Sequence, residues 1–219
     1  MPVLYLLRHG QASFGTSDYD QLSDLGRRQA TLGGVELVRR RVRTPVVVSG
    51  TLQRQRDTAI LAAAEIAAAG ISVDVTGTDP RFDEFDAHEA VDQHLGGPGA
   101  TDGMSSAQFQ AHLDDVMAAW IEDDSSFWGG FAQGAIEGLR DLAAGLGPGT
   151  DAVVATSAGV TAAVVGRLLG ADAEGVIALN RVSVNGSITT LVAGSRGLSV
   201  VTFNDHAHLL VEPGLRTSR

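Results

Sequence analysis

Short apolar runs alternate along this chain with longer stretches in which apolar residues recur at helical spacing. Residues 3–7 form a continuous apolar run of strand length, and residues 23–41 repeat apolar positions with a helical period, open on a Ser or Asp cap and stop before Pro45. Further strands are predicted at 44–49, 71–77 and 152–156, with helices at 51–69 and 158–169 and two between 105 and 146. This order predicts a mostly parallel sheet covered by helices, a three-layer α/β sandwich.

The end of the chain has a different pattern. Residues 187–194 and 198–205 are two strand-like runs separated by a short glycine turn, which is typical of a hairpin that adds an antiparallel edge. Residues 81–103 are polar and rich in glycine, so we expect an irregular excursion over the mouth of a site, within a cap-like insertion at about 84–128. No repeat or linker divides the chain, and residues 1–219 are expected to form a single domain.

Composition narrows the classes of protein. Of the 219 residues 44% are hydrophobic and 19% are charged, which favours a folded core. The 26 acidic and 16 basic residues give a net charge of −10, which argues against nucleic acid or a membrane surface as partner. With no cysteine there is no disulfide, thiolate metal site or cysteine nucleophile. No apolar stretch has the length of a membrane span, and the first residues do not resemble a signal peptide, so a cytoplasmic location is expected.

Polar residues directly follow three of the predicted strands. Arg8, His9 and Gly10 follow the first strand, residues 49–54 the second and residues 156–159 the fourth. Open α/β sheets bind ligands beyond the carboxyl ends of their strands, so we expect these segments to share one site. A neutral imidazole can attack phosphorus, a guanidinium binds phosphate oxygens through two parallel donors, and glycine lets the backbone approach closely. The residues therefore suit phosphoryl transfer.

Several motifs together resemble the histidine phosphatase superfamily, whose fold is of the phosphoglycerate-mutase type. "LYLLRHGQAS" resembles its strand with the RHG signature, and "YDQLSDLGRRQA" is similar to the start of its first helix. "VVVSGTLQRQRDTA" resembles the segment that carries a second arginine, and "RFDEFD" the element that carries an acidic proton donor. "TFNDHAHL" resembles the ending of some members, so the resemblance covers nearly the whole chain.

The resemblance implies a two-step hydrolysis of a small phosphorylated metabolite. His9 takes the phosphoryl group, Arg8 and Arg54 hold its oxygens, Glu84 protonates the leaving oxygen, and water then hydrolyses the phosphohistidine. The resemblance implies neither a cofactor nor a metal. Whether the chain forms a homodimer stays an open question at this point. Because the spacing from the serine to Arg54 is one residue longer than expected, Arg56 remains an alternative phosphate ligand. Asp83 and Asp86 remain alternatives to Glu84.

One position departs from the family pattern. The superfamily usually has a second histidine after its fourth strand, and Ser157 occupies that place here. A serine hydroxyl can donate one hydrogen bond to the phosphate but carries no positive charge. We therefore expect Ser157 to be a weaker phosphate ligand, and we hypothesise that His206 or His208 reaches the phosphate instead.

Three other functions are kept as alternatives. A mutase would need a basic cap around a bisphosphate, whereas residues 86–124 contain no lysine or arginine, which favours a phosphatase. Loss of the second histidine could also leave a non-catalytic protein that binds a phosphometabolite. Finally, "ATSAG" is a degenerate nucleophile elbow, with Ser157 as nucleophile and Asp205 and His208 downstream, but this interpretation leaves the RHG motif unexplained.

Overall fold

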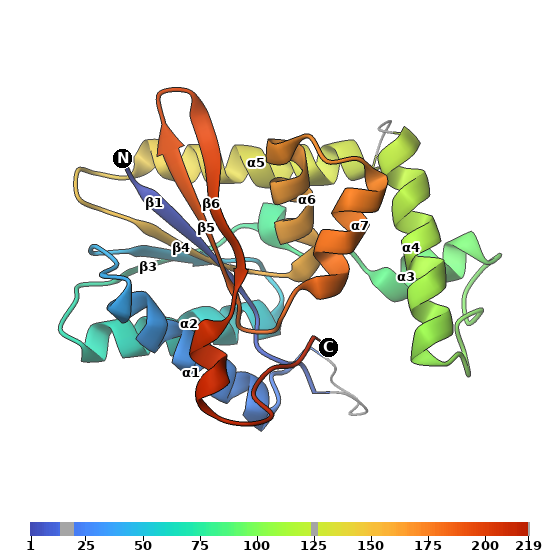
Figure 1. Cartoon of the computed structure of the whole chain (residues 1–219), viewed down its shortest axis with the longest axis horizontal. Coiled ribbons are helices and arrows are strands. Elements are labelled where there is room, and N and C mark those ends of the chain that lie inside the picture. Colours follow the sequence, from blue (N-terminus) through green and yellow to red (C-terminus); the bar gives the residue numbers. More distant parts are fainter. Residues whose placement is uncertain (14–19, 124–126, 219) are drawn as a thin grey trace.

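A six-stranded mixed sheet forms the centre of the computed structural model, which describes residues 1–13, 20–123 and 127–218. The strand order is β3-β2-β4-β1-β5-β6 (Figure 1). The strands are β1 (Val3–Arg8), β2 (Val46–Ser49), β3 (Asp74–Thr78), β4 (Ala152–Thr156), β5 (Ile188–Gly194) and β6 (Gly197–Asp205). The first four pair in parallel, whereas β5 and β6 form a hairpin that joins β1 antiparallel. The expected α/β class and its antiparallel edge are confirmed.

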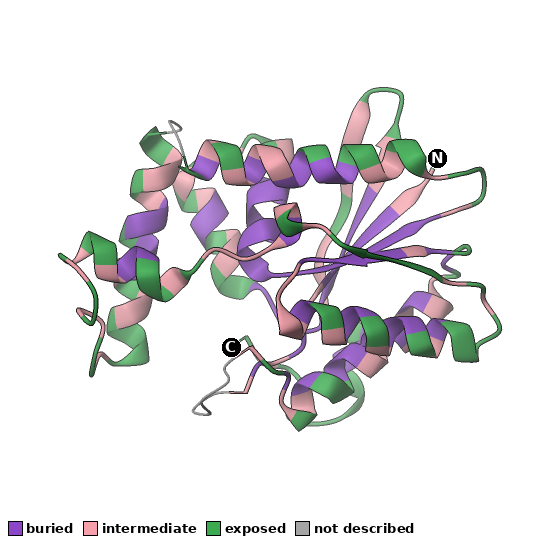
Figure 2. Cartoon of the chain, turned by 180° about the vertical axis from the view of Figure 1, so that it is seen from behind, coloured by how far each residue is buried: buried purple, intermediate pink, exposed green. Residues whose placement is uncertain are grey.

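Two helical layers cover the sheet because successive residues of its strands face opposite sides. Leu4 and Leu6 of β1 belong to a core that includes Leu139 of α5 (Phe127–Gly145) and Val164 of α6 (Ala158–Leu169). Leu7 belongs to the opposite core, with α1 (Asp24–Arg39) and α2 (Gln53–Ala68). Figure 2 shows the central strands β1, β2, β4 and β5 largely buried, the edge strands β3 and β6 more exposed, and these helices buried on the side that faces the sheet. The result is the expected three-layer sandwich.

Beyond the carboxyl ends of the parallel strands lies a separate helical group, made of α3 (Ala87–His94), α4 (Ser106–Asp123) and α7 (Ala173–Val182) (Figure 1). Val91, Met117 and Val176 of these helices form an apolar cluster with Trp128 at the start of α5. The expected cap-like insertion at 84–128 falls partly here, and its residues 124–126 lie outside the described part of the chain.

Two helices were not expected from the sequence. The predicted irregular segment 81–103 contains α3 and the end of the short helix η1 (Pro80–Phe82), and α7 follows α6 directly. Both α3 and α7 carry an aspartate cap: Asp86 accepts a hydrogen bond from the Glu89 N–H at 2.9 Å, and Asp172 accepts one from the Gly175 N–H at 2.9 Å. These two aspartates are the features of the sequence that could have indicated the starts of α3 and α7. Among the described residues, no helix is long and apolar enough to cross a membrane.

Candidate active site

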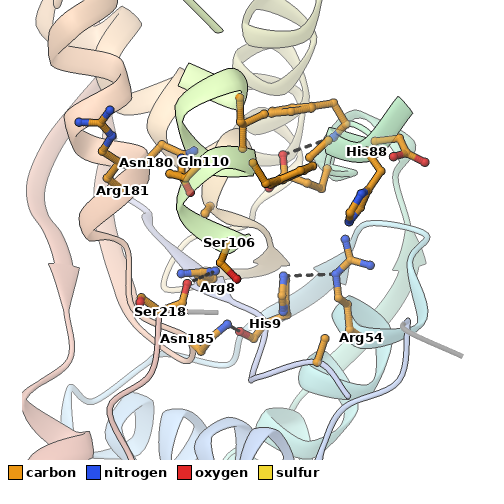
Figure 3. A pocket seen from close by; sticks show the side chains of 18 of the residues that line it. Arg8, His9, Arg54, His88, Ser106, Gln110, Asn180, Arg181, Asn185 and Ser218 are labelled. Carbon is orange, nitrogen blue, oxygen red and sulfur yellow. Dashed lines mark hydrogen bonds between the residues drawn. The ribbon is translucent and has the colours of Figure 1, made fainter. Parts of the chain in front are cut away.

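A pocket of about 860 Å³ opens at the carboxyl ends of the central strands (Figure 3). It brings together Arg8, His9, Arg54 and Glu84, four residues that the sequence assigned to one site. They come from the end of β1, the loop after it, the first turn of α2 and the loop after η1. The rest of the wall is mostly formed by α3, α4, α7 and nearby loops, and it includes Phe85, Asp86, His88, Ser106, Phe109, Gln110, Leu113, Asn180, Arg181 and Asn185.

His9 is held by backbone bonds on both sides. Its N–H donates to the Thr156 carbonyl at 2.8 Å, and its own carbonyl accepts from the Gly186 N–H at 3.3 Å and from the Asn185 amide at 3.4 Å. The imidazole Nδ1 lies 2.8 Å from the Gly10 carbonyl oxygen. Because a carbonyl only accepts, Nδ1 must carry the ring proton, and the lone pair of neutral His9 is on Nε2. This is the tautomer that an Nε2 nucleophile requires.

The surroundings of His9 keep its ring neutral. Burial lowers its pKa well below the ordinary 6.5, and the nearby cations Arg54 and Arg8 lower it further. Arg54 Nε lies 3.3 Å from His9 Nε2 and donates to that lone pair (Figure 3). The imidazole is therefore neutral at neutral pH. The Arg54 N–H that now donates to it could instead donate a hydrogen bond to a phosphate oxygen.

Both arginines are oriented by oxygen acceptors. Arg54 Nη1 donates to the Asp20 carboxylate at 2.7 Å. Arg8 Nη1 donates to the Ser183 carbonyl at 2.6 Å, and its Nη2 donates to the Ser218 carbonyl at 3.2 Å. Holding the guanidinium groups in advance reduces the rotamer entropy that phosphate binding would cost.

Glu84 is anchored at the start of α6. One carboxylate oxygen accepts from the Gly159 N–H at 2.9 Å and the other from the Phe85 N–H at 3.3 Å. Burial raises its pKa, and this effect outweighs the lowering by those two N–H groups and by the two arginines. A Cβ at residue 159 would lie 2.2 Å from a Glu84 oxygen, so only glycine leaves room for this anchor. Burial therefore favours the protonated form of this carboxyl group more than in an ordinary glutamate.

Hydrogen bonds to neighbouring elements hold the segment that carries Glu84. The Phe82 carbonyl accepts from Thr156 Oγ1 at 2.8 Å and from the Gln55 amide at 2.9 Å. Asp83 accepts from the Thr51 N–H and from its hydroxyl, the latter at 2.6 Å. Asp83 is therefore engaged in holding the loop, whereas Asp86, the other alternative acid, caps α3 and lines the pocket.

Two expected ligands of the phosphate are not at the pocket wall. Ser157 is completely buried, and its hydroxyl oxygen accepts from the Gln55 amide at 2.9 Å. Gly10 does not line the pocket either: a Cβ there would lie 2.1 Å from the Gly26 carbonyl oxygen, so glycine is needed for packing against α1. The structure therefore does not bring Ser157 or Gly10 to the pocket wall, where the sequence placed them.

The C-terminal histidines also lie elsewhere. His208 is buried in the short helix η2 (Ala207–Val211), where Nε2 donates to the Gly186 carbonyl at 3.0 Å and the neighbouring Leu209 packs against residues of α1. His206 Nδ1 donates to the Asn204 carbonyl at 2.6 Å. Neither lines the pocket, so the structure does not place either histidine where the superfamily usually has its second one. Arg56 likewise bonds to the Thr51 carbonyl and to Gln53, away from the pocket.

Sequence reasoning missed several residues of the wall. Asn185 and Arg181 enter from the chain after α6, and Asp20 holds Arg54 from the loop before α1. Asn185 and Arg181 do not stand next to a recognisable motif, and only the tertiary fold brings them to the pocket. Asp20 lies within the segment "YDQLSDLGRRQA", but no local pattern shows that it pairs with Arg54. Arg181 also places a cation at the pocket wall from outside the lysine- and arginine-free stretch 86–124. In the described part of the chain, no three His, Asp or Glu side chains gather as metal ligands would.

Comparisons with known proteins show which family and fold the chain shares. The model of the histidine phosphatase superfamily (branch 1) matches residues 4–206. A solved structure of mycobacterial glucosyl-3-phosphoglycerate phosphatase is similar, with 23% identity, a TM-score of 0.65 and coverage of 94% of this chain and 100% of that one. Phosphoserine phosphatase from Entamoeba histolytica shares 18% identity, with a TM-score of 0.59 and coverage of 95% and 100%. Bacillus stearothermophilus YhfR shares 17%, with a TM-score of 0.67 and coverage of 95% and 99%. No curated protein matches the chain.

Proposed function

The chain belongs to branch 1 of the histidine phosphatase superfamily, and we propose that it hydrolyses phosphomonoesters through a phosphohistidine formed on His9. The observation that carries this proposal is the 2.8 Å contact between His9 Nδ1 and the Gly10 carbonyl, from which the tautomer follows. The Nδ1 proton is engaged by the Gly10 carbonyl, while the Nε2 lone pair faces Arg54. A nucleophile, two guanidinium groups and an acid with a raised pKa line the same pocket.

In the first step, His9 Nε2 attacks phosphorus and the bond from phosphorus to the leaving oxygen breaks. Arg54 Nε–H moves from the Nε2 lone pair to a phosphate oxygen, and Arg8 neutralises another. The Glu84 hydroxyl donates its proton to the departing oxygen, so the leaving group is an alcohol. Positive charge that develops on the imidazole is stabilised at Nδ1 by the Gly10 carbonyl 2.8 Å away.

In the second step, water attacks phosphorus and the bond from phosphorus to Nε2 breaks. Glu84, now a carboxylate, accepts a proton from that water, which returns it to the acid form for the next cycle. The phosphate leaves with its charge still paired to Arg8 and Arg54. Both steps use the same acid-base group, so the scheme needs no titratable residue beyond those that line the pocket.

The alcohol part of the substrate would occupy the side of the pocket formed by α3 and α4. Phe85, Met104, Phe109 and Leu113 give this side an apolar character, and the His88 ring lies against Phe109 with centroids 4.6 Å apart. Arg8 and Arg54 line the pocket beside His9, and Arg181 at the wall pairs with Asp114, although the chain as a whole carries a net charge of −10. The pocket therefore supplies the local positive charge that a phosphate dianion requires.

Partitioning of the intermediate tests the proposal. All substrates would form the same phosphoenzyme, so its reaction with water or methanol cannot depend on the leaving group that has departed. In the presence of methanol, the ratio of methyl phosphate to inorganic phosphate is therefore expected to be the same for phenyl, 4-nitrophenyl and hexyl phosphates. Product analysis by phosphorus NMR measures it. A ratio that changes with the leaving group would show direct attack by water or methanol and would overturn the covalent scheme. Phosphate binding without any turnover would identify a binding protein.

A further inference from the structure

The Asp20 carboxylate bridges the two parts of Arg54, its backbone and its guanidinium group. Oδ1 accepts from Arg54 Nη1 at 2.7 Å and lies 3.4 Å from the Arg54 backbone N–H. Oδ2 accepts from the Gln53 backbone N–H at 2.7 Å. Because α2 begins at Gln53 with Leu52 as a cap that provides no side-chain oxygen, Asp20 supplies from a distant loop the acceptor that this helix start lacks.

These contacts fix the direction in which Arg54 points. With Nη1 held by Asp20, the Nε–H edge of the same planar group faces His9 Nε2 at 3.3 Å. The Arg54 side chain is 12% exposed and that of Asp20 is 35% exposed, so the pair is shielded from water on one side only. A planar guanidinium that is anchored at one corner retains few orientations for its remaining donors.

We propose that Asp20 is a positioning residue of this site: it anchors Arg54 so that the guanidinium holds the incoming phosphate over His9. Asp20 does not line the pocket and touches neither the nucleophile nor the acid. It acts through Arg54, and its kinetic consequences rest on the proposed hydrolysis, whereas its effect on phosphate binding does not.

A close control exists on the same helix. Asp57 pairs with Arg27 at 3.5 Å and accepts from the Gln53 side-chain amide at 2.6 Å, with a side chain that is 15% exposed. Asp57→Asn removes the same charge next to the same helix but leaves Arg54 and His9 untouched. Asp20→Asn keeps the size of the side chain while it removes the charge, and Asp20→Glu keeps the charge.

Binding of inorganic phosphate is the first readout. We expect Asp20→Asn to raise the Kd for phosphate about tenfold, the scale of one charge-assisted contact, as measured by isothermal titration calorimetry. Asp57→Asn is expected to stay within twofold of the wild type, and Asp20→Glu to recover part of the loss. Equal affinities in Asp20→Asn and the wild type would overturn the proposal. If the wild type turned over no phosphomonoester, the proposed function would fall, but this titration would still decide the role of Asp20.

The acid limb of kcat/KM is the second readout, because it separates positioning from a simple loss of charge. Arg54 and Arg8 are the charged groups that shift the pKa of His9, and the other titratable or charged residues of the described pocket are Glu84, Asp86, His88 and Arg181. If Arg54 swings away in Asp20→Asn, one cation that depresses the pKa of His9 is lost, and the acid limb moves to higher pH. Removal of a carboxylate with Arg54 still in place would move the limb the other way. An unchanged limb with a lower melting temperature would reduce Asp20 to a helix cap.

Discussion

Replacement of His9 by alanine is expected to lower kcat for phenyl phosphate by at least about 10⁴-fold, because it removes the atom that forms the covalent bond to phosphorus. Arg8 and Arg54 remain, so the variant should still bind inorganic phosphate. Steady-state phosphate release measures the first effect and calorimetry the second. Circular dichroism checks that the variant is folded.

His206→Ala is the matched control for this experiment. His206 donates to the Asn204 carbonyl and does not line the pocket, so its removal should leave kcat/KM within twofold of the wild type. A His9→Ala enzyme that keeps more than a tenth of its activity would contradict the assignment of the nucleophile. A large loss in His206→Ala would instead revive the role in phosphate binding that the sequence suggested for the C-terminal histidines.

Replacement of Glu84 by glutamine is expected to act according to the leaving group. Hexanol leaves as an alkoxide unless it is protonated, so its phosphate should lose about 10² to 10⁴-fold in kcat/KM. 4-Nitrophenol leaves readily as an anion, so 4-nitrophenyl phosphate should lose less than tenfold. Glycine 159 offers an independent route to the same result, because Gly159→Ala places a methyl group 2.2 Å from a Glu84 oxygen and must displace the carboxyl group.

Glu84→Gln is also expected to change the pH dependence of kcat/KM. Burial raises the pKa of Glu84, so the acid form persists to higher pH than for an ordinary glutamate and is lost as pH rises through the raised pKa. The pKa of His9 is lowered, so the nucleophile stays neutral until pH falls below the range of an ordinary histidine. The wild type should give a bell-shaped profile of kcat/KM for hexyl phosphate, and Glu84→Gln should lose its alkaline limb.

Asp86→Asn separates Glu84 from the nearest alternative acid. Asp86 also lines the pocket but is used as the cap of α3, so its amide variant should keep both the alkaline limb and the dependence on the leaving group. If Asp86→Asn lost the alkaline limb and Glu84→Gln kept it, the two roles would have to be exchanged.

The layers of the fold and the central motif were accessible from the sequence because they depend on local information. Apolar runs of strand length and helical periodicity located the strands and the long helices. The prediction for residues 158–169 coincides with α6, which starts after an apolar strand and ends at Gly170 in a left-handed cap. Arg8 is the last residue of β1 and His9 follows it, so the strand itself places both at its carboxyl end.

The remaining parts of the site depend on contacts between distant segments. Ser157 follows β4 as expected, but its side chain turns into the interior toward Gln55, and no local pattern indicates that direction. His208 follows the last strand, yet η2 turns back onto α1 and carries this histidine with it. Asp20 stands 34 positions from Arg54, so their ion pair exists only once α1 and α2 have packed together.

Direct identification of the phosphorylated residue is the sharpest test of the central claim. The wild type is mixed with a phosphomonoester, quenched within one turnover in alkali or in acid, and digested, and the fragments are analysed by mass spectrometry. A phosphohistidine intermediate predicts one phosphoryl group on the fragment that contains His9, retained in alkali and lost in acid. A phosphoryl group that survives acid and maps to a serine, or turnover with no phosphorylated fragment under either quench, would contradict the account.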